Sequence, residues 1–381
     1  MNLVYLDYAA TTPVDAEVAQ VMAQHLTLEG NFANPASRSH RFGWQAEEAV
    51  ESARITVAKL IGASNREIVW TSGATESNNL AIKGILEGFD SGHIITSSIE
   101  HKAILDTCAY AESAQGGGFE VTYLEPNEEG LITAAQVEQA LRPDTRLVSL
   151  MLVNNEVGNV TDIKSIASAL THHDALLHCD AAQGTGKLAI DVADMGVDLM
   201  SICAHKMYGP KGIGALYVRK ASNIKVYQQI HGGGHERGMR SGTLATHQIV
   251  GFAKAAELVM ANLESEIEHN SALRDQLWQG LEALEGVQRN THLTQASPNH
   301  LNVSFTGVDG EILLASLAQL AISSGSACNS ASVAPSYVLK ALGLADELAH
   351  AGIRFSVGRY TTTEDIEFAL AEITRVLQTL R

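Results

Sequence analysis

Residues 201–214 read SICAHKMYGPKGIG, and in this stretch Lys206 stands between two strand-forming runs. The run before it, Val197 to Cys203, and the run after it, Ile213 to Val218, are short and apolar, which is typical of buried strands. Glycines and one proline from Gly209 to Gly214 mark a turn between them. We therefore expect Lys206 at the end of a strand in a buried sheet, and not on a solvated helix face.

Two interpretations of Lys206 are open at this point. An amine held among apolar neighbours has a lowered pKa, so part of it is unprotonated and can form a Schiff base with an aldehyde cofactor. The alternative is a lysine that extends its ammonium to water and has only a structural role. Lys206 alone does not distinguish these two roles, so the other motifs of the sequence are needed.

The composition indicates a large globular protein. Its 381 residues include 45% hydrophobic and 18% charged residues, which predicts one large core and a smaller second domain. The net charge of -17 argues against nucleic acid as a direct partner. The chain begins without the pattern of a signal peptide, and no run reaches the roughly eighteen apolar residues of a membrane helix. We expect a cytoplasmic protein with no membrane contact.

The cysteines differ in their surroundings. Cys108, Cys179, Cys203 and Cys328 are widely spaced without a C-x-x-C pair, so we expect reduced thiols and no metal site. Cys328 lies in a run of small residues, SSGSACNSAS at 323–332. A structural cysteine is usually packed among apolar neighbours, whereas this run favours exposure. Cys328 is therefore interpreted as a reactive thiol.

One segment is basic although the chain is acidic. Seven basic residues and one acidic residue lie between Ser201 and Gly242. A small anionic ligand explains this excess, and so does a solvated basic face. The run HGGGHERGMRSGT at 231–243 suits a second anion contact better than a metal site, because its consecutive glycines disfavour the helix that a histidine pair would need.

Strands and helices alternate up to about Val218, which predicts a doubly wound, mainly parallel sheet. The run TSGATESNN at 71–79 follows one strand and opens a helix, so it is a candidate phosphate site, although plain helix capping explains the same residues. His101, Asn155 and Asp180 follow three further strands, at the edge where α/β sheets bind ligands. His101 is equally well explained as a residue at a helix start.

Two features near the carboxyl end complete the pattern. A long helix is expected from about His247 to His269, with a change of domain near Ser271. Arg354 lies within an apolar strand, so it needs a carboxylate partner from the protein or from a substrate. Neither a dinucleotide-binding G-x-G-x-x-G at the first strand and helix nor a G-x-x-x-x-G-K-[ST] motif is present in the sequence.

Taken together, these motifs resemble the class V, fold-type I pyridoxal-phosphate enzymes, and most closely the NifS/IscS-type cysteine desulfurases. The resemblance covers nearly the whole chain and is carried by LDYAATTP at 6–13, NPASRSH at 34–40, TSGATES at 71–77, AHK at 204–206, GGGHERGMRSGT at 232–243 and SSGSAC at 323–328. It implies an α/β fold with a large domain, residues 14–255, built on a mainly parallel seven-stranded sheet. Residues 1–13 and 256–381 would form a smaller α+β domain that carries the Cys328 loop.

The resemblance also implies roles for single residues. Lys206 would bind pyridoxal 5'-phosphate covalently, with Asp180 on the pyridine nitrogen and Gln183 on the ring oxygen. His101 would stack on the ring and take part in proton transfer. The other implied contacts are with the phosphate (Ala74, Thr75, Cys203, His205 and, across a homodimer, Thr243), with cofactor and substrate (Asn155), and with the substrate (Asn34, Arg354).

The implied reaction takes sulfur from L-cysteine, releases L-alanine and leaves a persulfide on Cys328. The sulfur would pass to protein acceptors, either an iron-sulfur scaffold or proteins of tRNA or DNA thiolation. The acceptor stays open, because the housekeeping members continue past the position of Arg381 into a scaffold-docking tail. In addition, Cys203 stands where a serine is usual, and a thiol is the weaker hydrogen-bond donor to a phosphate.

Three alternatives remain at this stage. A selenocysteine lyase or another lyase on the same fold is nearest, although Cys328 on its loop favours desulfuration. A non-catalytic sulfur-binding adaptor conflicts with the combined presence of Lys206, His101, Asp180 and Cys328. A thiol hydrolase that uses Cys328 and a histidine leaves Lys206 and the basic segment unexplained.

Overall fold

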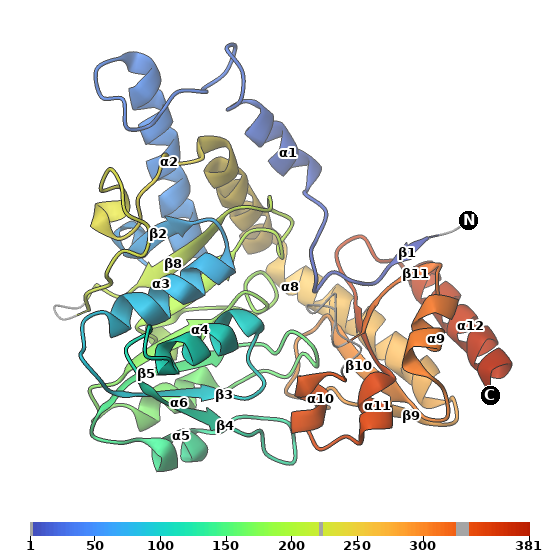
Figure 1. Ribbon diagram of the computed structural model, residues 1–381. Coiled ribbons are helices and arrows are strands. Elements are labelled where there is room, and N and C mark those ends of the chain that lie inside the picture. The colour runs from blue at the N-terminus through green and yellow to red at the C-terminus, as the bar shows by residue number, and fades with distance from the viewer. Residues whose placement is uncertain (1–2, 221–223, 325–334) are drawn as a thin grey trace.

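The computed structural model describes residues 3–220, 224–324 and 335–381, and its largest element is a seven-stranded sheet (Figure 1). Every neighbouring pair in this sheet is parallel except the two pairs formed by β8. The predicted mainly parallel, seven-stranded sheet is thus confirmed. Its strands lie in the order β2 (Ile68–Thr71), β8 (Gly214–Val218), β7 (Leu199–Cys203), β6 (Leu176–Asp180), β5 (Thr145–Met151), β3 (His93–Ser97) and β4 (Glu120–Leu124).

Both faces of this sheet are buried, as its continuous apolar strands require. Successive residues of a strand point to opposite faces, so in β2 the side chains of Ile68 and Trp70 join one hydrophobic cluster and Val69 joins another. Helices α2 (Arg41–Leu60) and α8 (Thr246–Glu282) contribute to the first cluster, and α3 (Ala74–Leu86) and α4 (Lys102–Glu112) to the second. The shorter helices of this part are α1 (Ala16–Ala23), η1 (Asn65–Glu67), α5 (Ala134–Ala140), α6 (Ile163–Ala169), α7 (Val192–Met195) and η2 (Glu236–Gly238).

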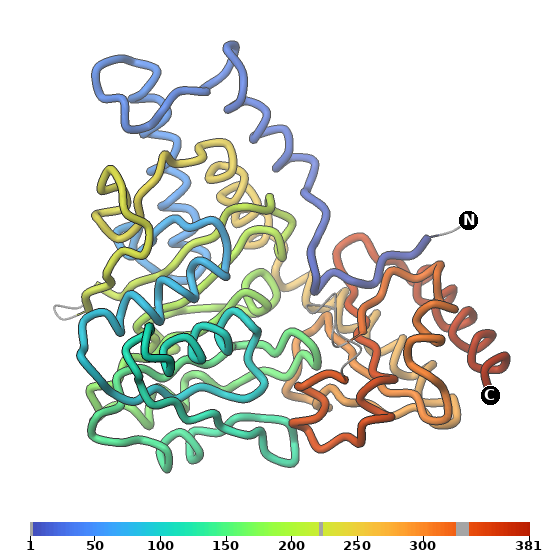
Figure 2. The backbone as a smooth tube through the Cα atoms, viewed as in Figure 1, coloured from blue at the N-terminus to red at the C-terminus, as the bar shows by residue number. Residues whose placement is uncertain are grey.

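An antiparallel four-stranded sheet lies near the carboxyl end of the chain (Figure 1). A separate hydrophobic cluster includes buried residues of this sheet. Strand β1 (Val4–Tyr5) pairs in parallel with β11 (Leu320–Ala321), so the amino-terminal segment lies in the same part of the molecule as the carboxyl terminus (Figure 2). The other elements of this part are β12 (Ser323–Ser324), β13 (Gly352–Ser356), β10 (His300–Phe305), β9 (Val287–Arg289), α9 (Gly310–Ser316) and α12 (Thr363–Leu380). Helices α10 (Tyr337–Ala341) and α11 (Asp346–His350) contribute buried residues to the cluster at the large sheet.

Helix α8 connects the two parts (Figure 1). Val259 belongs to the cluster at the large sheet, whereas Leu273 belongs to the cluster at the small one. The expected end of this helix near His269 is wrong, because leucines four residues apart continue its buried stripe as far as Leu281. The boundary between residues 255 and 256 therefore falls inside a helix, and the division into domains stays a prediction.

The cysteines described in the structure are reduced. Cys108, Cys179 and Cys203 are buried and free, and Cys328 lies outside the described residues. In the described ranges, none of the helices combines the length and the apolar character that crossing a bilayer requires.

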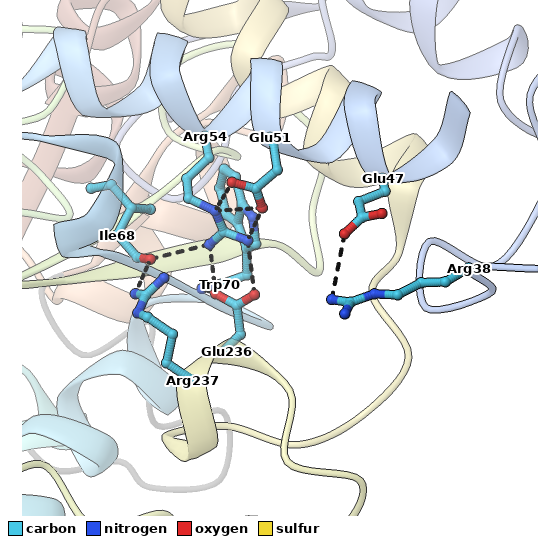
Figure 3. Close-up of polar contacts among 8 residues, drawn as sticks. All are labelled: Arg38, Glu47, Glu51, Arg54, Ile68, Trp70, Glu236 and Arg237. Carbon is cyan, nitrogen blue, oxygen red and sulfur yellow. Dashed lines mark hydrogen bonds and ion pairs between the residues drawn. The ribbon is translucent and has the colours of Figure 1, made fainter. Parts of the chain in front are cut away.

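A buried ion-pair network ties α2 to the edge of the large sheet (Figure 3). Arg54 of α2 donates to both carboxylate oxygens of Glu236, at 2.6 and 2.9 Å, and to the carbonyl of Ile68 at 3.1 Å. Glu236 also accepts the amide proton of Trp70 at 2.8 Å. The side chains of Arg54 and Glu236 are only 4% and 2% exposed, so removal of one leaves the other charge buried without its partner.

We expect Arg54→Met to lower the free energy of unfolding by about 3 to 5 kcal/mol, because the carboxylate of Glu236 stays buried. The matched control is Arg38→Met. It breaks the pair between Arg38 and Glu47, which lies 3.6 Å apart at the surface (Figure 3), and should cost at most about 1 kcal/mol. Urea denaturation measures both variants, and equal losses would contradict the role assigned to the buried pair.

Candidate active site

A cavity of about 610 Å³ lies where the parallel strands of the large sheet end. Asp180 is the last residue of β6, and His101, Asn155 and Lys206 follow β3, β5 and β7. The side chains of all four line the cavity. Parallel strands end at the same edge of a sheet, which explains this convergence. The predicted site residues that line the cavity are Ala74, Thr75, His101, Asn155, Asp180, Gln183, His205, Lys206 and Arg354.

Other predicted site residues lie away from this lining. Cys203 is buried within β7, and burial raises the pKa of its thiol. Thr243 and Asn34 are exposed, and Oδ1 of Asn34 accepts the amide proton of Ala36 at 2.9 Å. Cys328 lies outside the described residues. The functional roles of these residues stay predictions.

The turn that bears Lys206 contains a strained residue. Tyr208 has a φ of 65°, in the left-handed region that a bulky side chain rarely adopts. Its amide donates to Oγ1 of Thr12 at 2.8 Å, and its hydroxyl accepts the amide proton of Arg359 at 2.6 Å. The guanidinium of Arg359 also lies 4.1 Å from the centre of the Tyr208 ring. These contacts fix the turn just after Lys206.

Asp180 is held by two hydrogen bonds. Oδ2 accepts from the side-chain amide of Asn78 at 2.7 Å, and Oδ1 accepts the backbone amide proton of Ala182 at 2.9 Å. Asn78 lies in the run 71–79, and the sequence alone predicts no role for it. A signal is present, since Asn78 is a polar residue at helical spacing from the apolar residues that form the buried face of α3.

Two histidines at the cavity are held in the neutral form. Nδ1 of His101 accepts the amide proton of Ala103 at 3.0 Å, so the histidine is also the N-cap of α4 and its neutral ring carries the proton on Nε2. Burial, and to a smaller extent the charge of Lys206, lowers the pKa of His101. The same causes lower the pKa of His205 to about 4.

Arg354 has a protein partner. Its guanidinium lies 2.8 Å from Oδ1 of Asp7 and donates to the carbonyl oxygen of Asn155 at 2.6 Å. Asp7 is thus the carboxylate that the buried arginine requires. Arg354 nevertheless lines the cavity, and its Nε forms no hydrogen bond with the described residues.

Several buried polar atoms at the cavity lack a hydrogen-bond partner in the described part of the chain. They are the side-chain oxygens of Asn78, Asn155 and Gln183. Such atoms are costly unless a ligand or water satisfies them. The N-cap of helix α3 is Gly73, which has no side chain to cap the helix, so the first N–H groups of α3 suit an anion. The arrangement indicates a polar ligand that carries an anionic group.

Comparison with protein families gives a single assignment. The family model described as "Aminotransferase class-V" matches residues 4–368, which is nearly the whole chain. The chain therefore belongs to the class-V aminotransferase family.

Closer relatives define the type within that family. The cysteine desulfurase IscS of Acinetobacter baumannii (strain AYE) is 59% identical over 381 residues, which cover 99% of this chain and 93% of that protein. A solved structure described as a NifS-like protein is similar with a TM-score of 0.91 at 36% identity, covering 99% of this chain and 100% of the other. SspA in complex with cysteine is similar with a TM-score of 0.83 at 43% identity, covering 94% and 100%. Within its family, the chain belongs to the IscS/NifS-type cysteine desulfurases.

The pKa of His205 leads to a prediction about pH. The folded value is about 4 and the ordinary value is 6.5, so between these pH values the unfolded state binds more protons. The contribution of His205 to stability is therefore complete above pH 6.5 and is lost as the pH falls toward 4. We expect NMR titration of the histidine rings to give His205 a midpoint near pH 4, assigned by comparison with His205→Gln. A midpoint near 6.5 would contradict the buried, neutral ring.

Proposed function

We propose that the chain uses pyridoxal phosphate to take sulfur from L-cysteine and carries that sulfur as a persulfide on Cys328. The observation that carries this proposal is the convergence of Lys206, Asp180 and His101 on one cavity. A lysine, a buried carboxylate and a neutral histidine are the groups that this chemistry requires. Membership of the desulfurase family supports the same reaction.

The residues at the cavity fit the cofactor. Lys206 supplies the amine that binds its aldehyde, and Asp180 supplies a carboxylate for its pyridine nitrogen. Gln183 donates one N–H to the carbonyl of Ala9 at 2.9 Å, which leaves its second N–H for the ring oxygen. The uncapped start of α3, with Ala74 and Thr75, and the neutral His205 are assigned to the phosphate. When bound, the cofactor supplies an aldehyde that links to an amine and a ring that withdraws electrons from the substrate Cα.

Lys206 and His101 are assigned to proton transfer. The amine of Lys206, once the substrate amine has replaced it, accepts the proton from the substrate Cα. His101 is neutral with a proton on Nε2, so it can donate that proton inside the cavity. Its Nδ1 is occupied by the amide of Ala103, which fixes the orientation of the ring.

The sulfur step is assigned to Cys328. Its thiolate attacks the sulfur of L-cysteine, so that an S–S bond forms and the bond between that sulfur and the substrate Cβ breaks. The electron pair stays with the three-carbon fragment, which takes up protons and leaves as L-alanine. L-cysteine and a thiol thus give L-alanine and a persulfide, and no external oxidant or reductant is needed.

Substrate binding is assigned to the polar side of the cavity. Arg354 has N–H groups beyond those that contact Asp7 and Asn155, and these suit the carboxylate of L-cysteine. The unpartnered Oδ1 of Asn155 accepts from a bound donor, and Asn34 stays a proposed substrate contact. Cytoplasmic location and sulfur transfer to an iron-sulfur scaffold or to thiolation proteins also stay proposals.

We further propose a homodimer in which the partner's Thr243 completes the phosphate site. Thr243 is exposed and does not line the cavity of its own chain, which is consistent with a role across an interface. Phe32, Phe42 and Trp44 are 48%, 52% and 55% exposed, and large exposed apolar side chains of this kind are typical of an interface between chains.

The test uses the purified protein, Lys206→Ala and Cys328→Ala, with Cys108→Ala as the control for loss of a thiol. We expect the wild type to show the visible absorbance of a covalently bound cofactor and to form alanine and sulfide from L-cysteine in the presence of dithiothreitol. Lys206→Ala should lose that absorbance, whereas Cys328→Ala should keep it and release no sulfide. A colourless wild type, or sulfide release by Cys328→Ala at the full rate, would refute the proposal.

A further inference from the structure

Lys187 is a buried cation that the proposed reaction does not use. It lies in the loop after β6, which also carries Gln183, and it is only 6% exposed. Burying an ammonium group is costly unless hydrogen bonds or an opposite charge compensate. The ammonium of Lys187 donates to the main-chain carbonyl oxygen of Lys206 at 2.9 Å. The structure thus places a buried ammonium group against the main chain of Lys206, which lines the cavity.

A second contact lies beside this hydrogen bond. Gly186 has a φ of 78°, and a Cβ at this position would lie 2.8 Å from Cβ of Met207. Such a distance leaves no room for a side chain, so glycine permits the loop to approach the turn. Adjacent residues of the loop, Gly186 and Lys187, therefore contact adjacent residues of the turn, Met207 and Lys206.

The turn also needs support. Tyr208 is strained, and strained residues persist only where their surroundings hold them. Thr12 and Arg359 hold Tyr208, on the carboxyl side of Lys206. Lys187 adds a contact at Lys206 itself. Together these contacts fix the main chain from which the Lys206 side chain extends.

The charge of Lys187 acts on Lys206 as well. Burial, and then the charge of Lys206, lowers the pKa of Lys187 to about 8. The same repulsion opposes a proton on Lys206, whose unprotonated amine is the reactive form. The titratable groups that interact with Lys187 come from β7 and the turn after it, from α8 and from β10, and they are Cys203, His205, Lys206, Glu266 and His300.

We propose that Lys187 is a positioning residue for Lys206, which fixes its main chain by the hydrogen bond and favours its unprotonated amine by electrostatic repulsion. Lys187 is not part of the cavity lining, so it acts through Lys206 and not on the substrate. The inference rests on the proposed function, because it takes Lys206 as the lysine that binds the cofactor.

The experiment measures how fast the full chain, freed of cofactor, regains visible absorbance after addition of pyridoxal phosphate, between about pH 6 and about pH 10. Lys187→Met removes the charge and the donor, Lys187→Gln keeps a neutral donor, and Lys187→Arg keeps both. The control is Lys254→Met, which removes a lysine that pairs with Glu17 at the surface of the molecule. Circular dichroism of each variant checks that it is folded.

We expect the pH midpoint of cofactor capture to rise by about one unit in Lys187→Met and in Lys187→Gln, because the repelling charge is gone. Lys187→Arg and Lys254→Met should keep the wild-type midpoint. At high pH, Lys187→Met should capture the cofactor about tenfold more slowly, with Lys187→Gln between it and the wild type, because an amide restores part of the hydrogen bond.

Three results would overturn the inference. The first is a folded Lys187→Met variant that captures the cofactor with the wild-type pH midpoint and rate. The second is an equal shift of the pH midpoint in Lys187→Met and Lys187→Arg. The third is loss of folded structure in both Lys187→Met and Lys187→Gln, which would make Lys187 a structural residue. In each of these cases the wild type still captures the cofactor at Lys206, so the proposed function stands. A wild type that captures no cofactor would refute the proposed function instead.

Discussion

Because both faces of the large sheet are covered by helices, the polar side chains of the candidate active site lie at the edge where the strands end. Inside such a sheet a polar side chain loses its contact with water and must find protein partners. His178 in β6 shows this, since its two ring nitrogens bond to Ser149 and Ser201, each at 2.9 Å. Side chains at or beyond the strand ends can find partners in the loops instead, as Asp180 does with Asn78 and Ala182. The meeting of Asp180 and Lys206 follows from the parallel course of their strands.

The sequence was sufficient to predict the strands and the turn at Lys206, because apolar runs and Gly/Pro turns are local signals. The partners of the polar residues could not be predicted, because they come from distant segments. Asn78 lies 102 positions from Asp180, and Asp7 lies 347 positions from Arg354. The end of α8 was missed for a related reason. Its periodicity does not show that the helix leaves one hydrophobic cluster and enters another.

The charge of a sequence segment also does not show which acidic residues the fold will bring next to its basic residues. The basic excess between Ser201 and Gly242 suggests an anion site, yet part of it is balanced by acids. Arg240 pairs with Glu76 on α3 at 2.7 Å, and Arg219 pairs with Asp198 at the start of β7. Lys206 and Lys211 are the basic residues of the segment that line the cavity. Only these two of the seven basic residues in the segment, all of which the structure describes, are therefore placed to interact with an anion in the cavity.

Helix α8 sets the relative orientation of the two hydrophobic clusters. Val259 and Leu273, one in each cluster, are fourteen residues apart, which is about four turns, so they lie on nearly the same side of the helix. One inserted residue between them would rotate one cluster against the other by about 100° and shift it by about 1.5 Å. Seven inserted residues make about two full turns and keep the helical phase. The length of α8 is therefore free to vary only in steps that preserve this phase.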